Sequence, residues 1–217
     1  MVSRQSLLLH PAARAVVFCV CVLPFAWLTT RALGNHLGAN PAEALIRATG
    51  DWALRFLCMA LAVTPLRSIT NTPALARFRR MLGLFVYFYV ALHLLCYSWF
   101  DMGFDVADIL GDIVKRPFIL VGFAAFVLLT PLAATSFNAA IKWLGSRRWQ
   151  MLHKLVYGIA GLGLLHFFWI RAGKNNFAEV LVYAAIITAL LGWRVAQHVR
   201  KPVAAARRSL PVRWSAP

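Results

Sequence analysis

Long apolar runs separated by short polar segments dominate the chain. A helix that spans a membrane needs about 20 mainly apolar residues, and six such runs occur, at 14–33, 51–69, 81–100, 117–135, 151–170 and 177–197. The second run is the least regular, because Arg55 and Pro65 interrupt it. The pattern predicts an all-α fold in which a bundle of six membrane-spanning helices forms a single domain over residues 1–217.

The composition agrees with this interpretation. Of the 217 residues, 61% are hydrophobic and 14% are charged, whereas about a quarter of the residues in soluble domains are charged. The first run has the length of a signal peptide, but no small-residue cleavage site follows it and five further runs do. We therefore expect it to be retained as a helix.

The charged residues divide between alternate loops. With the N-terminus in the cytoplasm, 16 of the 23 Lys and Arg residues fall on the inner side, without an acid. The outer side then holds all seven acids: Glu43, Asp51, Asp101, Asp105, Asp108, Asp112 and Glu179. By the positive-inside rule this predicts two cytoplasmic termini. The net charge of +16 therefore reflects topology and contact with membrane lipid, and not binding of nucleic acid.

Three histidines lie inside the apolar runs, His93 in the third and His153 and His166 in the fifth. An ionisable residue in a bilayer is costly and suggests a functional site, unless a neutral imidazole merely bonds to a neighbouring helix. Because three occur on two spans, we favour a functional role. For the histidines at span ends or in loops, a solvated side chain is the simpler interpretation: His10, His36 and His198.

His93 and His166 are predicted to lie at similar depths. His93 precedes Trp99 by six residues and His166 precedes Trp169 by three, and both tryptophans are expected at the outer boundary. At about 1.5 Å per residue the two depths differ by about 5 Å. The two imidazoles can therefore face each other across a haem in the outer half of the membrane. Two imidazole ligands are typical of an electron-transfer haem.

His153 is predicted about 20 Å nearer the inner face than His166, and about 140° around the helix from it. That position suits a second redox centre, although the inner depth offers only His10 and His198 as weak partner ligands. The alternatives are that His153 contacts the same haem in another state or binds a different cofactor.

Arginines gather at the inner ends of the two histidine-bearing spans. Positive-inside anchoring accounts for them, and a site for a flavin phosphate or a quinone headgroup is the sharper alternative. The residues concerned are Arg77, Arg79, Arg80, Arg147 and Arg148.

Four aspartates of the outer loop have helical spacing, so we expect one acidic face on a short interfacial helix, where a partner outside the membrane docks. They are Asp101, Asp105, Asp108 and Asp112.

A small transporter or proton channel that uses the histidines as a relay is the alternative function. The spans carry few other polar residues and no acid that we expect to be buried, which disfavours this alternative.

Three segments carry a family resemblance: "RFRRMLGLFVYFYVALHLLCY", "KRPFILVGFAAFVLLTPLAATS" and "LGSRRWQMLHKLVYGIAGLGLLHFFW", spread over roughly residues 63–170. They resemble the ferric-reductase-like transmembrane family, which includes NADPH oxidases. Within it, the chain is most similar to the haem-binding membrane subunits of bacterial periplasmic methionine-sulfoxide reductase systems.

The resemblance implies haem b, one or two per chain, with His93, His153 and His166 as ligands to the iron, and a bound FMN. It implies a place in the bacterial inner membrane and electrons from the quinone pool or a cytoplasmic flavin reductase. The electrons would pass to a separate periplasmic subunit that contains a molybdenum cofactor and reduces methionine sulfoxide in proteins.

Two departures from the wider family matter. Two-haem members carry four histidines, two on each of two helices, whereas the third span here carries one. No nucleotide-binding domain follows the sixth span, so we expect a separate electron donor and a separate catalytic subunit.

Overall fold

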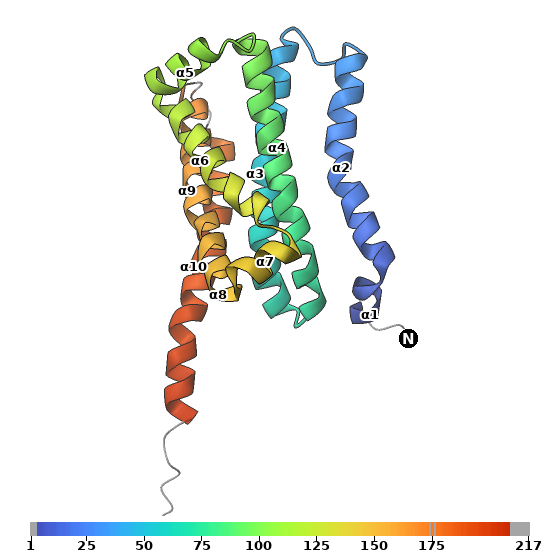
Figure 1. The fold of residues 1–217 in the computed structure, drawn as a ribbon, viewed down its shortest axis with the longest axis vertical. Helices are drawn as coiled ribbons and strands as arrows, with labels where there is room; N and C mark the ends of the chain where they lie inside the picture. The colour runs from blue at the N-terminus through green and yellow to red at the C-terminus, as the bar shows by residue number, and fades with distance from the viewer. Residues whose placement is uncertain (1–3, 174, 176, 209–217) are drawn as a thin grey trace, which may run out of the picture.

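The structure is a computed structural model that describes residues 4–173, 175 and 177–208. The predicted cytoplasmic ends at residues 1–3 and 209–217 lie outside the described residues. Six helices are long and apolar enough to cross a membrane (Figure 1), which confirms the predicted all-α six-helix class. They are Pro11–Leu33, Pro41–Ile69, Pro73–Asp101, Pro117–Ala134, Ser146–Ala172 and Ala178–Arg200.

Four of these spans are single helices: α2 (Pro11–Leu33), α3 (Pro41–Ile69), α6 (Pro117–Ala134) and α10 (Ala178–Arg208). The third joins a 3₁₀-helix η1 (Pro73–Phe78), α4 (Arg79–Cys96) and a π-helical turn η2 (Tyr97–Asp101). The fifth joins α8 (Ser146–His153) and α9 (Leu155–Ala172). Short helices complete the described part: α1 (Arg4–Leu9), α5 (Val106–Lys115) and α7 (Asn138–Leu144).

Helix α3 begins ten residues before the predicted start at residue 51. The Asn40 side chain accepts a hydrogen bond from the Glu43 amide (3.1 Å), and Pro41 occupies the first turn, so the local sequence favours an early start. Asp51 therefore lies within a spanning helix, where it pairs with Arg171 (3.6 Å). The spans were expected to hold no buried acid; Asp51 keeps 23% of its side chain exposed and is paired with an arginine distant in sequence.

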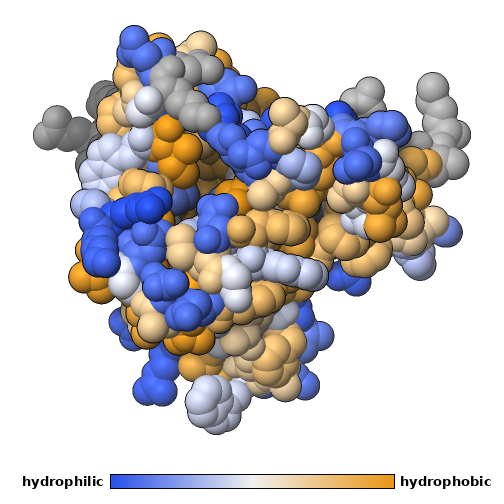
Figure 2. Space-filling model, turned by 90° about the horizontal axis from the view of Figure 1, so that it is seen from above, coloured by the Kyte–Doolittle hydropathy of each residue, from blue (hydrophilic) through white to orange (hydrophobic). Residues whose placement is uncertain are grey.

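The charges separate along the bundle. One end, called the acidic end, carries η2, α5 with its cap residue Asp105, the first turns of α3 and the start of α10, which together hold the seven acids. The opposite, basic end carries η1 and α8. In Figure 1 the acidic end is at the top, and Figure 2 shows it face-on, with hydrophilic residues gathered around hydrophobic ones.

Two helix pairs form the body of the bundle. Helix α3 packs along α4, and α6 packs along α9. The core between α3 and α4 is aromatic: the Phe56 ring stacks on Tyr89 (centroids 5.0 Å apart) and on Phe85 (5.6 Å). The functional groups described below lie between these two pairs.

Helix α2 docks at the side of the bundle through a buried hydroxyl. Pro24 interrupts α2, and the Phe25 amide donates to the Tyr89 hydroxyl (3.0 Å) in place of a helical carbonyl. The hydroxyl in turn donates to the Cys21 carbonyl (3.0 Å). Tyr89, which is fully buried, thus bridges the donor and acceptor that an unbroken helix would join directly.

Candidate cofactor site

His93 on α4 and His166 on α9 face each other between the two helix pairs. Their ring centroids lie 6.1 Å apart, with 78° between the ring planes. Both rings line a cavity of about 510 Å³ enclosed by α3, α4, α6 and α9, a size typical of small-molecule sites. The structure therefore brings together the two histidines that were predicted at similar depths.

Each imidazole is oriented by a backbone carbonyl of the neighbouring helix. His93 Nδ1 donates to the Ile46 carbonyl (2.8 Å), and His166 Nδ1 donates to the Phe118 carbonyl (2.7 Å). Because a carbonyl oxygen only accepts, these contacts place the proton on Nδ1 in both neutral rings. Each Nε2 is left with a lone pair and no hydrogen bond to the described residues, which is the state in which imidazole binds a metal.

A glycine makes room for each ring. Gly50 lies four residues after Ile46, and a Cβ there would stand 3.2 Å from His93 Nδ1. Gly122 lies four residues after Phe118, and a Cβ there would stand 2.7 Å from His166 Nδ1. The two helix pairs thus use the same arrangement. One helix of each pair supplies a carbonyl that accepts from the imidazole and, one turn later, a glycine against which the imidazole packs.

The paired rings fit the two axial positions of a haem. A metal–imidazole bond of about 2 Å, with about 1 Å more to each ring centre, gives roughly 6 Å between the centroids. The observed 6.1 Å agrees with this spacing. Towards the basic end the cavity walls are apolar, with Leu57, Val86 and Ile159 among them.

Three arginines line the cavity towards the acidic end, and each is paired with an acid. Arg171 contacts Glu179 (2.6 Å) as well as Asp51. The other pairs join Arg47 to Glu43 (2.5 Å) and Arg116 to Asp112 (2.8 Å). The cavity therefore has an apolar end and a charged mouth, and the described cations that line its wall all lie at that mouth.

His153 lies apart from this pair. It ends α8, its ring stacks on Trp149 (centroids 3.9 Å apart), and its Nδ1 donates to the Trp149 carbonyl (3.0 Å). Its Nε2 is buried and has no hydrogen-bond partner among the described residues. His153 does not line the cavity, and the described residues contain no group of three or more metal-binding side chains.

The predicted arginine group divides by its contacts. Arg77 donates to the Leu8 carbonyl (2.7 Å), and Arg80 donates to the Ser136 carbonyl and to Asn138 Oδ1 (2.7 Å for the latter). These two side chains therefore hold neighbouring segments together. The remaining three are exposed and form no hydrogen bond or ion pair with the described residues: Arg79, Arg147 and Arg148.

The four aspartates of the predicted docking face do not form an open acidic row. Asp105 caps α5 by accepting from the amides of Ala107 (2.8 Å) and Asp108 (3.0 Å). Asp112 accepts from the Tyr97 hydroxyl (2.8 Å) in addition to its arginine. The prediction of one helical face for all four was wrong, because only Asp108 and Asp112 lie on α5, while Asp101 ends η2 and Asp105 precedes the helix. Two of the carboxylates, Asp105 and Asp112, are used inside the fold.

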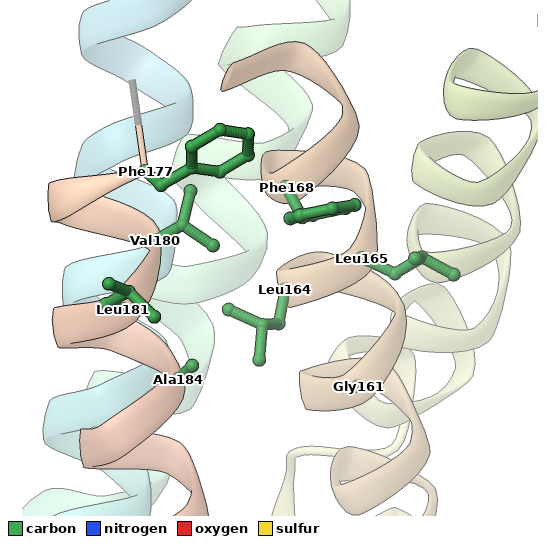
Figure 3. A pocket seen from close by; sticks show the side chains of 8 residues that line it. All are labelled: Gly161, Leu164, Leu165, Phe168, Phe177, Val180, Leu181 and Ala184. Atoms are coloured by element: carbon green, nitrogen blue, oxygen red, sulfur yellow. The ribbon is translucent and has the colours of Figure 1, made fainter. Parts of the chain in front are cut away.

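A second, open groove lies between α9 and α10 and has a volume of about 460 Å³. Figure 3 shows its lining, which is apolar throughout and includes Leu164, Phe168, Phe177 and Val180. Without a polar group to orient a ligand, this groove is suited to contact with lipid chains.

The sequence alone did not reveal the orienting carbonyls, the two glycines or the arginines at the mouth. The glycines left a signal, because each occurs in a helix at the depth of a buried histidine. Which helix neighbours which histidine depends on the tertiary fold.

Comparison with known proteins identifies the family. Residues 49–164 match the ferric reductase like transmembrane component family. The protein-methionine-sulfoxide reductase heme-binding subunit MsrQ of Polaromonas naphthalenivorans is 77% identical over 201 residues, which cover 93% of this chain and 92% of that protein. Proteins of the same name are 53% identical in Herminiimonas arsenicoxydans, over 84% of each chain, and 44% identical in Caulobacter vibrioides, over 88% of this chain and 90% of that protein. No solved structure matches. The chain therefore belongs to the MsrQ family of ferric-reductase-like transmembrane proteins.

Proposed function

We propose that this protein is a haem-binding transmembrane electron-transfer subunit of a methionine-sulfoxide reductase system. The observation that carries the proposal is the His93–His166 pair, with ring centroids 6.1 Å apart in a cavity between two helix pairs. The relatives are named as heme-binding subunits, and the free Nε2 atoms of this pair are the groups that would hold the iron. A haem bound there supplies one-electron transfer.

The surrounding residues prepare this site. The carbonyls of Ile46 and Phe118 fix the ring tautomers and orientations, as hydrogen bonds to metal-binding histidines commonly do. If His93 and His166 both held the iron, no coordination position would be left open for oxygen. The apolar wall excludes water, and the arginines of the charged mouth can bind the carboxylates of the porphyrin.

Electrons enter, in this proposal, at the basic end, which faces the cytoplasm of a bacterial inner membrane. The donor is the quinone pool or a cytoplasmic flavin reductase. FMN or the donor's headgroup binds among the exposed arginines, with His153 near this inner redox step. The guanidinium groups of Arg79, Arg147 and Arg148 form no hydrogen bond or ion pair with the described residues and are available for that purpose.

The acceptor is the periplasmic molybdenum-cofactor subunit, MsrP, which reduces methionine sulfoxide in proteins. It docks at the acidic end, nearer the His93–His166 pair. The chain itself carries electrons, and the catalytic subunit is a separate protein.

Reconstitution in lipid vesicles tests this proposal. A reduced quinol or a flavin reductase with NADH is supplied at the basic end, and the haem α band is followed before and after MsrP and a methionine-sulfoxide substrate are added at the acidic end. We expect reduction of the haem, then reoxidation that depends on MsrP and is lost in His166→Ala. A haem that is reduced but never reoxidised by MsrP contradicts the assigned acceptor. Proton flux through a colourless protein would instead support the histidine relay.

A further inference from the structure

Tyr97 connects the helix that carries His93 to the surface helix α5. It follows His93 by about one helical turn, lies on the π-helical η2 and lines the cavity. π-Helical turns are rare and often occur at functional sites. The Tyr97 hydroxyl donates to Asp112 Oδ2 (2.8 Å) on α5. Because the two residues are 15 positions apart, this hydrogen bond closes the excursion of the chain through α5 and fixes that helix at the mouth of the cavity.

Asp112 is shared between two donors. Its Oδ2 accepts from Tyr97, and its Oδ1 lies 2.8 Å from Arg116 Nε. The Asp112 side chain is 10% exposed, whereas that of Arg116 is 55% exposed. Removing a donor from a largely buried carboxylate is costly, because the charge then lacks one of its hydrogen bonds. The three side chains therefore form one connected unit, called here the mouth clasp: Tyr97, Asp112 and Arg116.

The mouth clasp joins the elements that hold the two candidate ligands. Tyr97 belongs to the same wall of the cavity as His93. Arg116 precedes α6 and stands two residues before Phe118, whose carbonyl orients His166. The clasp thus runs from the helix that bears one imidazole, by way of α5, to the segment that orients the other imidazole (Figure 1).

The mouth clasp also determines where the Arg116 side chain stands. Arg116 lines the cavity, and its guanidinium forms no hydrogen bond or ion pair with described residues other than Asp112. A guanidinium held by a carboxylate presents its donors in a fixed plane. The orientation of this cation at the mouth therefore depends on Asp112, and the orientation of Asp112 depends on Tyr97.

We propose that Tyr97 and Asp112 are positioning residues of the haem site. Through Arg116 they set the position of the α6 wall relative to α4, and with it the relative orientation of the His93 and His166 rings. Groups that orient the ligands of a metal commonly tune its properties without touching it. This inference rests on the proposed function, because it concerns the site at which the two histidines would hold the iron.

Matched variants of the full chain, purified with its haem, test the positioning role. Tyr97→Phe removes one oxygen atom and leaves the ring, and Asp112→Asn keeps the shape but removes the charge. The controls are Tyr183→Phe on α10 and Asp108→Asn on α5, because neither residue lines the cavity. Three properties are measured: the electron paramagnetic resonance g values of the oxidised haem, its midpoint potential, and the rate at which haem transfers to apomyoglobin.

We expect both clasp variants to change the g values and the midpoint potential, and to release haem about tenfold faster than their controls, as fits the loss of one hydrogen bond to a charged group. Values equal to those of the controls overturn the proposal. A lower thermal midpoint with unchanged g values and potential also overturns it, because the clasp then serves stability alone. Tyr97→Phe decides the matter if Asp112→Asn does not fold.

The wild-type protein separates this inference from the proposed function. A wild type without a low-spin haem contradicts the proposed function and the positioning role together. A wild type with the expected haem, beside clasp variants that behave as the controls do, contradicts the positioning role alone.

Discussion

The imidazole of His166 lies against the α-carbon of Gly122, so closely that a Cβ at this glycine would stand 2.7 Å from Nδ1. His93 lies against Gly50 in the same way, at 3.2 Å. In both cases the absent side chain lets the ring reach a carbonyl of the neighbouring helix. Gly50 and Gly122, which have no side chain, therefore determine how the two candidate ligands are oriented.

The substitution Gly122→Ala is expected to weaken haem binding. The added methyl group collides with the His166 ring and must push it off the Phe118 carbonyl, a kind of overpacking that costs about 1–3 kcal/mol. The measurement is the haem-to-protein ratio with the low-spin spectrum. Gly158→Ala is the control, since nothing lies within 4 Å of a Cβ there. An unchanged haem content and spectrum in Gly122→Ala would show that the His166 ring can bind haem in a different orientation.

The variants His93→Ala and His166→Ala are each expected to lose most of the haem absorbance, because each removes one of the two proposed iron ligands. His153→Ala is expected to retain it, since His153 does not line the cavity. His198→Ala, at an exposed position, is the control for loss of an imidazole. A full low-spin spectrum in His166→Ala would refute the ligand assignment. Loss of about half the haem in His153→Ala would establish a second haem.

The variant Arg171→Ala is expected to lower the free energy of unfolding by about 3–5 kcal/mol, because it leaves Asp51 without its partner inside a spanning helix. The additional change Asp51→Asn should restore part of the loss by removing the unpaired charge. Arg47→Ala breaks an (i, i+4) pair with Glu43 and should cost under about 1 kcal/mol. The thermal midpoints of the four proteins in detergent give the comparison. Equal thermal midpoints for Arg171→Ala and Arg47→Ala would mean that the Arg171–Asp51 pair contributes no more to stability than the Arg47–Glu43 pair.

The variant Tyr89→Phe is expected to destabilise the docking of α2. It leaves the Phe25 amide and the Cys21 carbonyl unsatisfied beside Pro24, at a cost of about 1–3 kcal/mol. Tyr183→Phe, on α10, is the control for removal of a phenol hydroxyl, and limited proteolysis between α2 and α3 is the measurement. Equal protection of both variants would show that the bridge is dispensable.

The positions of the spans and the matched depth of His93 and His166 followed from the sequence, because hydropathy and counting to Trp99 and Trp169 report depth directly. The start of α3 did not, since it depends on a cap at Asn40 and on an ion pair from α9. The partners of the two imidazoles depend on which helices are neighbours, and no local pattern specifies that.

The contacts of the arginines could not be predicted from the sequence either. Their number at the basic end was evident from the sequence, but their contacts were not. Arg77 and Arg80 hold neighbouring segments together, whereas Arg79 forms no hydrogen bond or ion pair with the described residues. Arg194 drew no attention in the sequence, because one arginine near the end of a span is ordinary. Its hydrogen bonds to Tyr157 on α9 and to the Leu61 carbonyl on α3 appear only in the folded structure.

The most direct test of the account is the visible spectrum of the detergent-purified protein, oxidised and then reduced with dithionite, with pyridine-haemochrome quantitation. The account predicts a Soret band that shifts on reduction, sharp α and β bands, and a single six-coordinate haem b per chain. A colourless protein, after expression with ample haem, or a five-coordinate high-spin haem would contradict the assignment of His93 and His166 as its two ligands.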